Sequence, residues 1–258
     1  MIFLFLVCAL FFFVGCDYIQ DPIPPEPKLV AQKPPEASVR VDLGEHQTIR
    51  TIQEKITPII DAIIHEELKK IPGALKHDIP KFIRNPKCHF TLFYLGHIEE
   101  KSEPVLVNSL KRMQASGVGN GQIRDIEFSD QADFFGDTRE ELVIKIHDTH
   151  NDITKLHNDI RQAFIKANNT HKLFSLKYSD RYQFIPHVTL GKILGNAICA
   201  YAQAAGADGD LVFETIKQKI LYEITKLLKN FEWDKKISVQ NFQIYGGSGK
   251  LLQNFSLL

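Results

Sequence analysis

Two copies of one short pattern contain the residues best suited to chemistry. The sequence has His89-Phe90-Thr91-Leu92 and, much later, His187-Val188-Thr189-Leu190. Histidine, with an ordinary pKa of about 6.5, can take up or release a proton at neutral pH. Two histidines on opposite sides of one phosphate can act as base and acid, while the threonine hydroxyls donate to its non-bridging oxygens. Such a site requires no metal ion and no cofactor.

Each copy falls within an expected strand. Apolar residues typical of strands surround the first copy over residues 88–95 and the second over residues 187–193. Alternate residues of a strand point to the same face, so the histidine and threonine of each copy face together, and the residues between them point to an apolar side. One such pattern alone is usually structural. Two copies, each with leucine after the threonine, favour a paired site.

The remaining periodicities predict the elements that position these residues. Further strands are expected over residues 39–43, 142–146 and 237–244, the last with a bulge, and helices over residues 49–63, 105–113, 153–164 and 212–228. Pro58 is expected to kink or restart the first helix. The order shows no regular β-α-β array, so the expected fold class is α+β.

The N-terminal sequence predicts a targeting signal followed by a tether. Residues 1–15 carry no charge and form an apolar run too short to span a bilayer, as in a signal peptide. Gly15 and Cys16 resemble the lipobox of bacterial lipoproteins, in which the cysteine is acylated. Residues 16–37 are then a lipidated cysteine with a proline-rich tether, and residues 38–258 are the folded domain. We expect an extracytoplasmic, membrane-anchored lipoprotein; the alternative is a cytosolic domain on an uncleaved anchor.

Composition narrows the classes of ligand. The 258 residues include 31 basic and 31 acidic side chains, so the formal net charge is zero. This balance does not favour a long basic groove for nucleic acid, but it allows a small anionic ligand held by a few groups. The 4 cysteines are too few for a disulfide-dense scaffold. Cys88 and Cys199 could pair outside the cytoplasm, although a buried, inert thiol is the expected state of Cys88.

The two patterns resemble the two signatures of the two-histidine phosphoesterases. Residues 89–96 match the first signature and residues 186–191 match the second. This superfamily includes the bacterial RNA 2′-5′ ligase-like proteins and cyclic nucleotide phosphodiesterases. The resemblance implies a bilobal fold, in which two pseudo-symmetric lobes, each with an antiparallel sheet and helices, present one signature apiece to a central cleft.

The resemblance also implies roles. His89 and His187 would be the catalytic acid–base pair, and Thr91 and Thr189 would bind the phosphate. The expected function is a metal-independent phosphodiesterase acting on a 2′,3′-cyclic phosphate or a 2′-5′ linkage in a small nucleotide or short RNA end, with ligation also possible. We expect a monomer. The alternative is a membrane-anchored lipoprotein that binds nucleotides or a partner without turnover.

Other residues near the signatures leave alternatives open. The superfamily often has a basic residue after the second signature, and Lys192 could fill that role. In a regular strand, however, alternation from His187 would place Lys192 on the opposite face. Tyr94 and Tyr182 could stack a base, although a regular strand would turn Tyr94 into the core. Residues 194–210 either help to select the substrate or form a surface insertion, and we favour the insertion.

Two further clusters have a structural interpretation. His147, Asp148, His150 and His157 contain metal-ligand types, but their spacing favours helix capping and solvated side chains over a metal site. The glycine-rich residues 117–121 lack the lysine and the preceding strand of a phosphate-binding loop, which favours a flexible turn.

Overall fold

The computed structural model describes residues 36–43, 46–73, 79–117, 125–171 and 183–257. These lie in the unit Pro34–Leu258. The expected signal peptide, Cys16, residues 17–35 of the expected tether, Tyr182 and residues 118–121 lie outside the described residues, and the expectations for them stay predictions. The last residue of the expected tether, Ala37, is already the first residue of a strand. No helix within the described ranges is long and apolar enough to cross a membrane.

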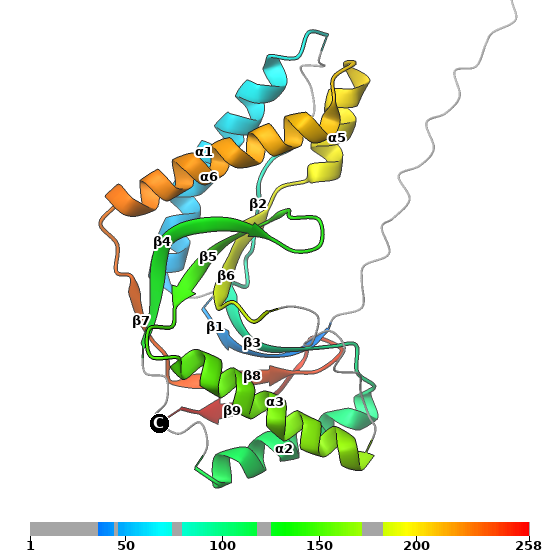
Figure 1. Ribbon diagram of the computed structural model, residues 1–258, viewed down its shortest axis with the longest axis vertical. Helices are drawn as coiled ribbons and strands as arrows, with labels where there is room; N and C mark the ends of the chain where they lie inside the picture. Colours follow the sequence, from blue (N-terminus) through cyan, green and yellow to red (C-terminus); the bar gives the residue numbers. More distant parts are fainter. Residues whose placement is uncertain (1–35, 44–45, 74–78, 118–124, 172–182, 258) are drawn as a thin grey trace, which may run out of the picture. The chain divides into compact units, whose positions relative to one another are not determined.

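An antiparallel sheet runs through the described unit (Figure 1). Its strands lie in the order β7-β4-β5-β6-β3-β1-β8-β9, and β2 pairs with β6 beside this path. Their bounds are β1 (Ala37–Asp42), β2 (Ile83–Arg84), β3 (His89–Gly96), β4 (Asp125–Phe135), β5 (Glu141–His147), β6 (His187–Lys192), β7 (Lys236–Ser238), β8 (Asn241–Tyr245) and β9 (Leu251–Ser256). The two halves of the sheet, β3-β1-β8-β9 and β6-β5-β4-β7, meet at the antiparallel pair of Phe90 and Val188.

Helices pack on both halves of the sheet. They are α1 (Gln47–Lys69), α2 (Glu103–Ala115), α3 (Asp152–His171), α5 (Gly195–Ala204) and α6 (Gly209–Asn230), with a short 3-10 turn η1 (Glu100–Ser102) before α2. Figure 1 shows α2 and α3 beside the β3-β1-β8-β9 half, where α3 contacts β3 and α2 contacts β9, whereas α1 packs on α6 and α6 contacts β4. The α+β fold with an antiparallel sheet and helices on each half is confirmed.

The helices form because each has an apolar stripe at helical spacing. In α1 the stripe Ile49, Ile52, Ile56, Ile60 and Ile64 is 0–1% exposed. Burying each isoleucine contributes about 1.5–3 kcal/mol to the free energy of unfolding. The helix continues past Pro58, so the restart considered there does not occur.

The expected bulged strand over residues 237–244 is wrong. The structure has two strands, and they pair in different halves of the sheet: β7 pairs with β4, whereas β8 pairs with β1. Ile237 and Phe242 are both buried. The change of phase between Val239 and Phe242 therefore marks a change of partner strand rather than an extra residue in one strand.

Residues 194–210 form regular structure. Most of the stretch is α5, which packs against α6 through the buried Ile198 and Ala202. A Cβ added at Gly209 would lie 2.7 Å from the carbonyl oxygen of Cys199, so glycine allows the two helices to approach closely. The segment is therefore one helix of a helical hairpin, with α6 as the other, rather than a loop.

At Gly191 the second signature packs tightly against β2 and the residue before it. A Cβ at this position would lie 2.4 Å from the carbonyl oxygen of Ile83 and 2.4 Å from Cζ of the buried Phe82. We expect Gly191→Ala to lower the free energy of unfolding by about 1–3 kcal/mol, because β2 would have to move away from β6. Urea unfolding of the two proteins measures this difference, and an unchanged midpoint would contradict it.

Candidate active site

The structure brings the histidines and threonines of both signatures to one face of the sheet. Phe90 pairs with Val188 in antiparallel register, so His89 lies opposite Thr189 and Thr91 lies opposite His187. Phe90 and Val188 are fully buried, whereas the four polar residues are half-buried. We call the side of the sheet that carries these four residues the motif face. The sequence predicted each pair correctly as sharing a face, and the strand pairing joins the two pairs.

Both imidazole rings are fixed in the same way. Nδ1 of His89 lies 2.8 Å from the carbonyl oxygen of Lys87, and Nδ1 of His187 lies 2.7 Å from that of Ile185. A carbonyl oxygen can only accept a hydrogen bond, so each Nδ1 must carry the proton and donate it. Each ring therefore leaves Nε2 as the atom for chemistry. The partner in each case is the residue two positions earlier.

Burial favours the neutral form of both histidines. It is the largest cause lowering the pKa of His89 and of His187, and in each case the carbonyl bonded to Nδ1 opposes it. The charges of Arg40 and His187 further lower the pKa of His89, whereas Asp42 raises it. Neutral Nε2 atoms suit proton acceptance, and the ring that donates must first be protonated.

A charged network beside His89 was missed from the sequence. Across β1 and β3, Asp42 lies opposite His89 and Arg40 lies opposite Thr91, so both belong to the motif face. Arg40 Nε lies 3.2 Å from Asp42 Oδ1, and its guanidinium carbon lies 3.4 Å from the centre of the Tyr245 ring. The Tyr245 hydroxyl donates to Asp42. This places a fixed positive charge beside Thr91.

The signal for this network was present in the sequence. Residues 39–43 read Val-Arg-Val-Asp-Leu, and the arginine and aspartate alternate with buried apolar residues. The alternation predicts that Arg40 and Asp42 share a face of the first strand. What it does not reveal is that this strand pairs directly with the first signature.

His187 has different neighbours in the other half of the sheet. Phe135 meets its ring edge-on, with ring centres 4.6 Å apart. Lys145 lies opposite His187 across β5 and β6, and its Nζ is 2.9 Å from Asp133 Oδ2. The motif face is thus asymmetric: an arginine lies opposite the first threonine, whereas an aromatic ring contacts the second histidine.

A bulge in β3 brings Tyr94 to the motif face. Thr91 pairs with Arg40 and Phe93 pairs with Val39, so Leu92 is an extra residue in β3. Leu92 and Phe93 are both buried, and the next residue, Tyr94, is half-buried. The expectation that Tyr94 packs in the core is therefore wrong, because the bulge reverses the alternation after the first signature.

A bulge after the second signature has the same effect on Lys192. Thr189 pairs with Val143 and Gly191 pairs with Leu142, so Leu190 is the extra residue. Lys192 is then paired with Glu141, which shares its strand face with Lys145. The expectation that Lys192 lies on the face opposite His187 is wrong for this reason. Tyr94 and Lys192 are thus the fifth residue after the histidine of their respective signatures, on the same face.

The other candidates have structural roles in the described part of the chain. Asp148 caps α3, since its carboxylate accepts the backbone N–H groups of Ile153 and Thr154. Cys88 and Cys199 are free thiols, and burial raises the pKa of Cys88 to about 12, so its thiolate is not available. Among the described residues, no group of three or more histidine, cysteine, aspartate or glutamate side chains is placed to hold a metal ion.

Comparisons with known proteins bear on the fold and the family of this chain. A comparison with curated proteins gave no match. Among solved structures, Kluyveromyces marxianus Usb1 is 11% identical and has a TM-score of 0.55, with 86% of this chain and 96% of that chain covered. Escherichia coli LigT complexed with 3′-AMP is 16% identical, with a TM-score of 0.41 and coverage of 87% and 98%. The likeness to Usb1 shows the fold.

The family is shown by a sequence model. The model of the 2′-5′ RNA ligase superfamily matches residues 60–211, which include both signatures and more than half of the chain. The chain therefore belongs to the 2′-5′ RNA ligase superfamily.

Proposed function

We propose that the protein is a phosphodiesterase that acts on small nucleotide substrates with a 2′,3′-cyclic phosphate or a 2′-5′ linkage. Membership of the 2′-5′ RNA ligase superfamily supports phosphodiester chemistry in general. The observation that carries the finer proposal is the pair of imidazoles on one face, each with Nδ1 bound to a carbonyl oxygen and Nε2 available. Two such atoms can serve the attacking and the leaving oxygen of one phosphate.

The proposed reaction is an in-line displacement at phosphorus. One neutral Nε2 accepts a proton from water as the water oxygen bonds to phosphorus. The bond from phosphorus to the 2′ or 3′ oxygen breaks, and the protonated Nε2 of the other histidine donates its proton to that oxygen. The two histidines have then exchanged protonation states. With the hydroxyl group of a second chain in place of water, the same displacement on a cyclic phosphate would join the two chains, which is ligation.

Charge stabilisation in this reaction is assigned to three groups on the motif face. The hydroxyls of Thr91 and Thr189 would donate to the non-bridging oxygens, each from the position opposite the other signature's histidine. Arg40 would supply the positive charge, because it lies opposite Thr91 and is held by Asp42 and Tyr245. Planar guanidinium groups are well matched to phosphate oxygens.

Two residues at the edges of the motif face are assigned to binding the rest of the substrate. Tyr94 offers an aromatic ring for a base, and the exposed Lys192 offers a charge for a second phosphate or a substrate end. Since the chain is formally neutral, a few local groups rather than a basic surface would hold the ligand. The membrane anchor at Cys16 stays a separate prediction that rests on the sequence alone.

The test is turnover of a defined set of substrates. The purified protein would be incubated in EDTA with the four 2′,3′-cyclic nucleotides, a 2′-5′ dinucleotide and the matching 3′-5′ dinucleotide as control. The proposal predicts turnover of a cyclic or 2′-5′ substrate, and the position of the product phosphate identifies the bond that breaks. Tight binding of all of these without turnover would instead favour a nucleotide-binding protein, and neither binding nor turnover would contradict the substrate class.

A further inference from the structure

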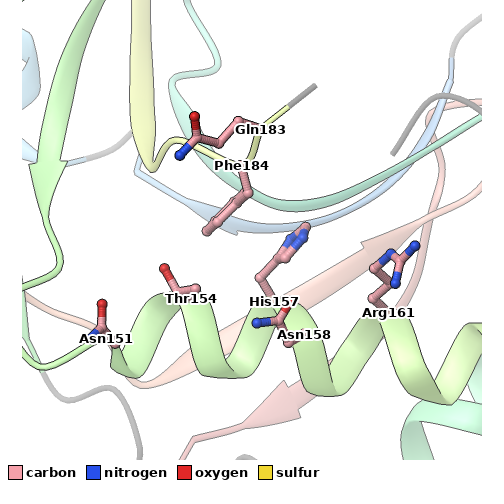
Figure 2. Close-up of a pocket in the computed structure, with 7 residues that line it drawn as sticks. All are labelled: Asn151, Thr154, His157, Asn158, Arg161, Gln183 and Phe184. Atoms are coloured by element: carbon pink, nitrogen blue, oxygen red, sulfur yellow. The ribbon is translucent and has the colours of Figure 1, made fainter. Parts of the chain in front are cut away.

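A polar side chain from a helix holds each signature strand at its bulge. On β3, Nδ1 of His157 in α3 lies 2.7 Å from the carbonyl oxygen of Leu92. Figure 2 shows the His157 ring beside that of Phe184, in the lining of a pocket along α3. On β6, Nε2 of Gln53 in α1 lies 2.7 Å from the carbonyl oxygen of Leu190. Each of these leucines directly follows the threonine of its signature, so both signatures are anchored to a helix.

Gln53 is a buried amide within the isoleucine stripe of α1, and it is only 7% exposed. Besides the carbonyl oxygen of Leu190, its Nε2 lies 2.8 Å from the carbonyl oxygen of Asn85. Because carbonyl oxygens can only accept hydrogen bonds, the nitrogen of this amide must face both of them. A buried amide is costly unless its hydrogen bonds are made. Gln53 therefore fits this position through the two backbone groups that it holds.

Asn85 lies in the short connection between β2 and β3, and its side chain joins the two signatures. Its Oδ1 accepts a hydrogen bond from the backbone N–H of Lys87 at 3.1 Å, and the carbonyl oxygen of Lys87 is the group that holds the His89 ring. Its Nδ2 donates to the carbonyl oxygen of Thr189 at 3.1 Å, and its backbone N–H donates to that of Leu190 at 2.9 Å. Each end of the amide thus faces the partner that its chemistry requires.

The bulge in β6 explains why two amides are needed here. Successive carbonyl groups of a regular strand point to opposite sides, toward different neighbouring strands. The carbonyls of Thr189 and Leu190 are successive, yet both accept hydrogen bonds from the same side, the first from Asn85 and the second from Asn85 and Gln53. These two side chains therefore fix the bulge that ends the second signature.

We propose that Asn85 and Gln53 are positioning residues that together set the distance and orientation between the two signature histidines. Asn85 orients His89 through the Lys87 peptide and ties that peptide to the backbone of Thr189, while Gln53 holds the assembly from α1. Neither side chain touches substrate in this account. The kinetic part of the inference rests on the proposed function, because it requires both histidines to serve one phosphate.

The variants separate the two ends of the Asn85 amide from a simple loss of stability. Asn85→Ala removes both side-chain hydrogen bonds. Asn85→Asp keeps the acceptor for the Lys87 N–H but replaces the donor to the Thr189 carbonyl with an oxygen. Asp61→Ala is the matched control, because the Asp61 carboxylate accepts a hydrogen bond from the backbone N–H of Phe82 at 2.8 Å, just before β2. The control loses one structural hydrogen bond at the other end of this strand.

The first measurement is steady-state kinetics on the best substrate of the panel. Asn85→Ala and Asn85→Asp should each lower kcat about tenfold and change KM less than about twofold, because a displaced ring fails in the transition state rather than in binding. Gln53→Met, which keeps the side-chain length but has no donor, should show the same split. Asp61→Ala, compared at an equal folded fraction by circular dichroism, should keep the kcat of wild type.

Three kinetic results would overturn the inference. They are a wild-type kcat in Asn85→Ala, a loss in Asp61→Ala as large as that in Asn85→Ala, and a change in KM alone. If Asn85→Ala does not fold, Asn85→Asp decides the same question, since it retains the hydrogen bond that shapes the connection.

The second measurement does not depend on turnover. Imidazole ¹⁵N chemical shifts, recorded at pH 8, distinguish a ring protonated at Nδ1 from one protonated at Nε2, and the spectrum of His89→Ala assigns His89. This ring should be protonated at Nδ1 in wild type and Asn85→Asp but should show both forms in Asn85→Ala. His187, held by the carbonyl of Ile185, should keep its proton on Nδ1 throughout.

The two measurements distinguish the two ways to fail. If wild type turns over no substrate but the His89 ring changes as expected in Asn85→Ala, the proposed function is wrong and the positioning of this ring by Asn85 is supported. An unchanged His89 ring in a folded Asn85→Ala protein would overturn the role of Asn85, whatever the activity.

Discussion

Replacing His89 or His187 with alanine is expected to lower kcat by about 10²–10⁴-fold in either case. In the proposed reaction each ring supplies one of the two proton transfers, and each offers the same atom, Nε2, because its Nδ1 donates to a carbonyl oxygen two residues upstream. Water cannot replace either ring efficiently, since it has neither the fixed position nor the pKa. The loss should appear in kcat more than in KM, because proton transfer occurs in the transition state.

Two controls make this prediction specific. His147→Ala removes an exposed histidine at the end of β5 and should leave kcat unchanged. The double variant His89→Ala/His187→Ala should be only slightly slower than either single variant, since the two rings act as one unit. Steady-state kinetics on the best substrate of the panel measure all four proteins. Full activity in either single variant would show that the paired-histidine account is wrong.

Replacing Arg40 with methionine is expected to lower kcat by about 10²-fold, by removal of the positive charge proposed to stabilise the phosphate oxygens. The guanidinium is fixed by the Asp42 carboxylate at 3.2 Å and by stacking on the Tyr245 ring, and its side chain is only 18% exposed. Methionine keeps much of the volume, so packing should change little. Circular dichroism melting would establish that the fold is retained.

The geometry of Arg40 also predicts the effect of conservative changes. Arg40→Lys should recover only part of the activity, because an ammonium group neither stacks as a plane nor donates two parallel hydrogen bonds. Tyr245→Phe keeps the stacking ring but removes the hydroxyl that donates to Asp42, so its effect should be severalfold at most. Wild-type kcat in Arg40→Met would exclude Arg40 from the reaction, and an equal loss in Tyr245→Phe would indicate that the whole network acts only through His89.

The sequence predicts the paired signatures because strand alternation is a local property. His89 and Thr91 must share a face in any strand, and so must His187 and Thr189. The fold class follows from the same periodicities. The sequence does not predict that Phe90 pairs with Val188, and it is this pairing that brings the two faces together into one candidate site.

Non-local pairing explains most of what the sequence failed to predict. Arg40 lies on the motif face because β1 pairs with β3. The periodicity of a strand does not reveal which strand lies next to it. The bulges at Leu92 and Leu190 are also hidden, since two consecutive buried residues look like ordinary core. Each bulge changes the face of every later residue in its strand, which is why Tyr94 and Lys192 were placed on the wrong side.

The pH dependence of kcat/KM, recorded in EDTA from pH 4 to pH 9, tests the central claim most directly. In the proposed mechanism the active form of the free enzyme has one protonated and one neutral histidine, so kcat/KM should follow a bell-shaped profile whose two limbs are set by the macroscopic pKa values of the pair. Burial lowers the pKa of both rings, so the maximum should lie below about pH 6.5. Above both pKa values the protonated acid is lost, and kcat/KM should fall about tenfold for each pH unit. A plateau from neutral to alkaline pH, or loss of activity in EDTA, would contradict catalysis by the paired histidines alone.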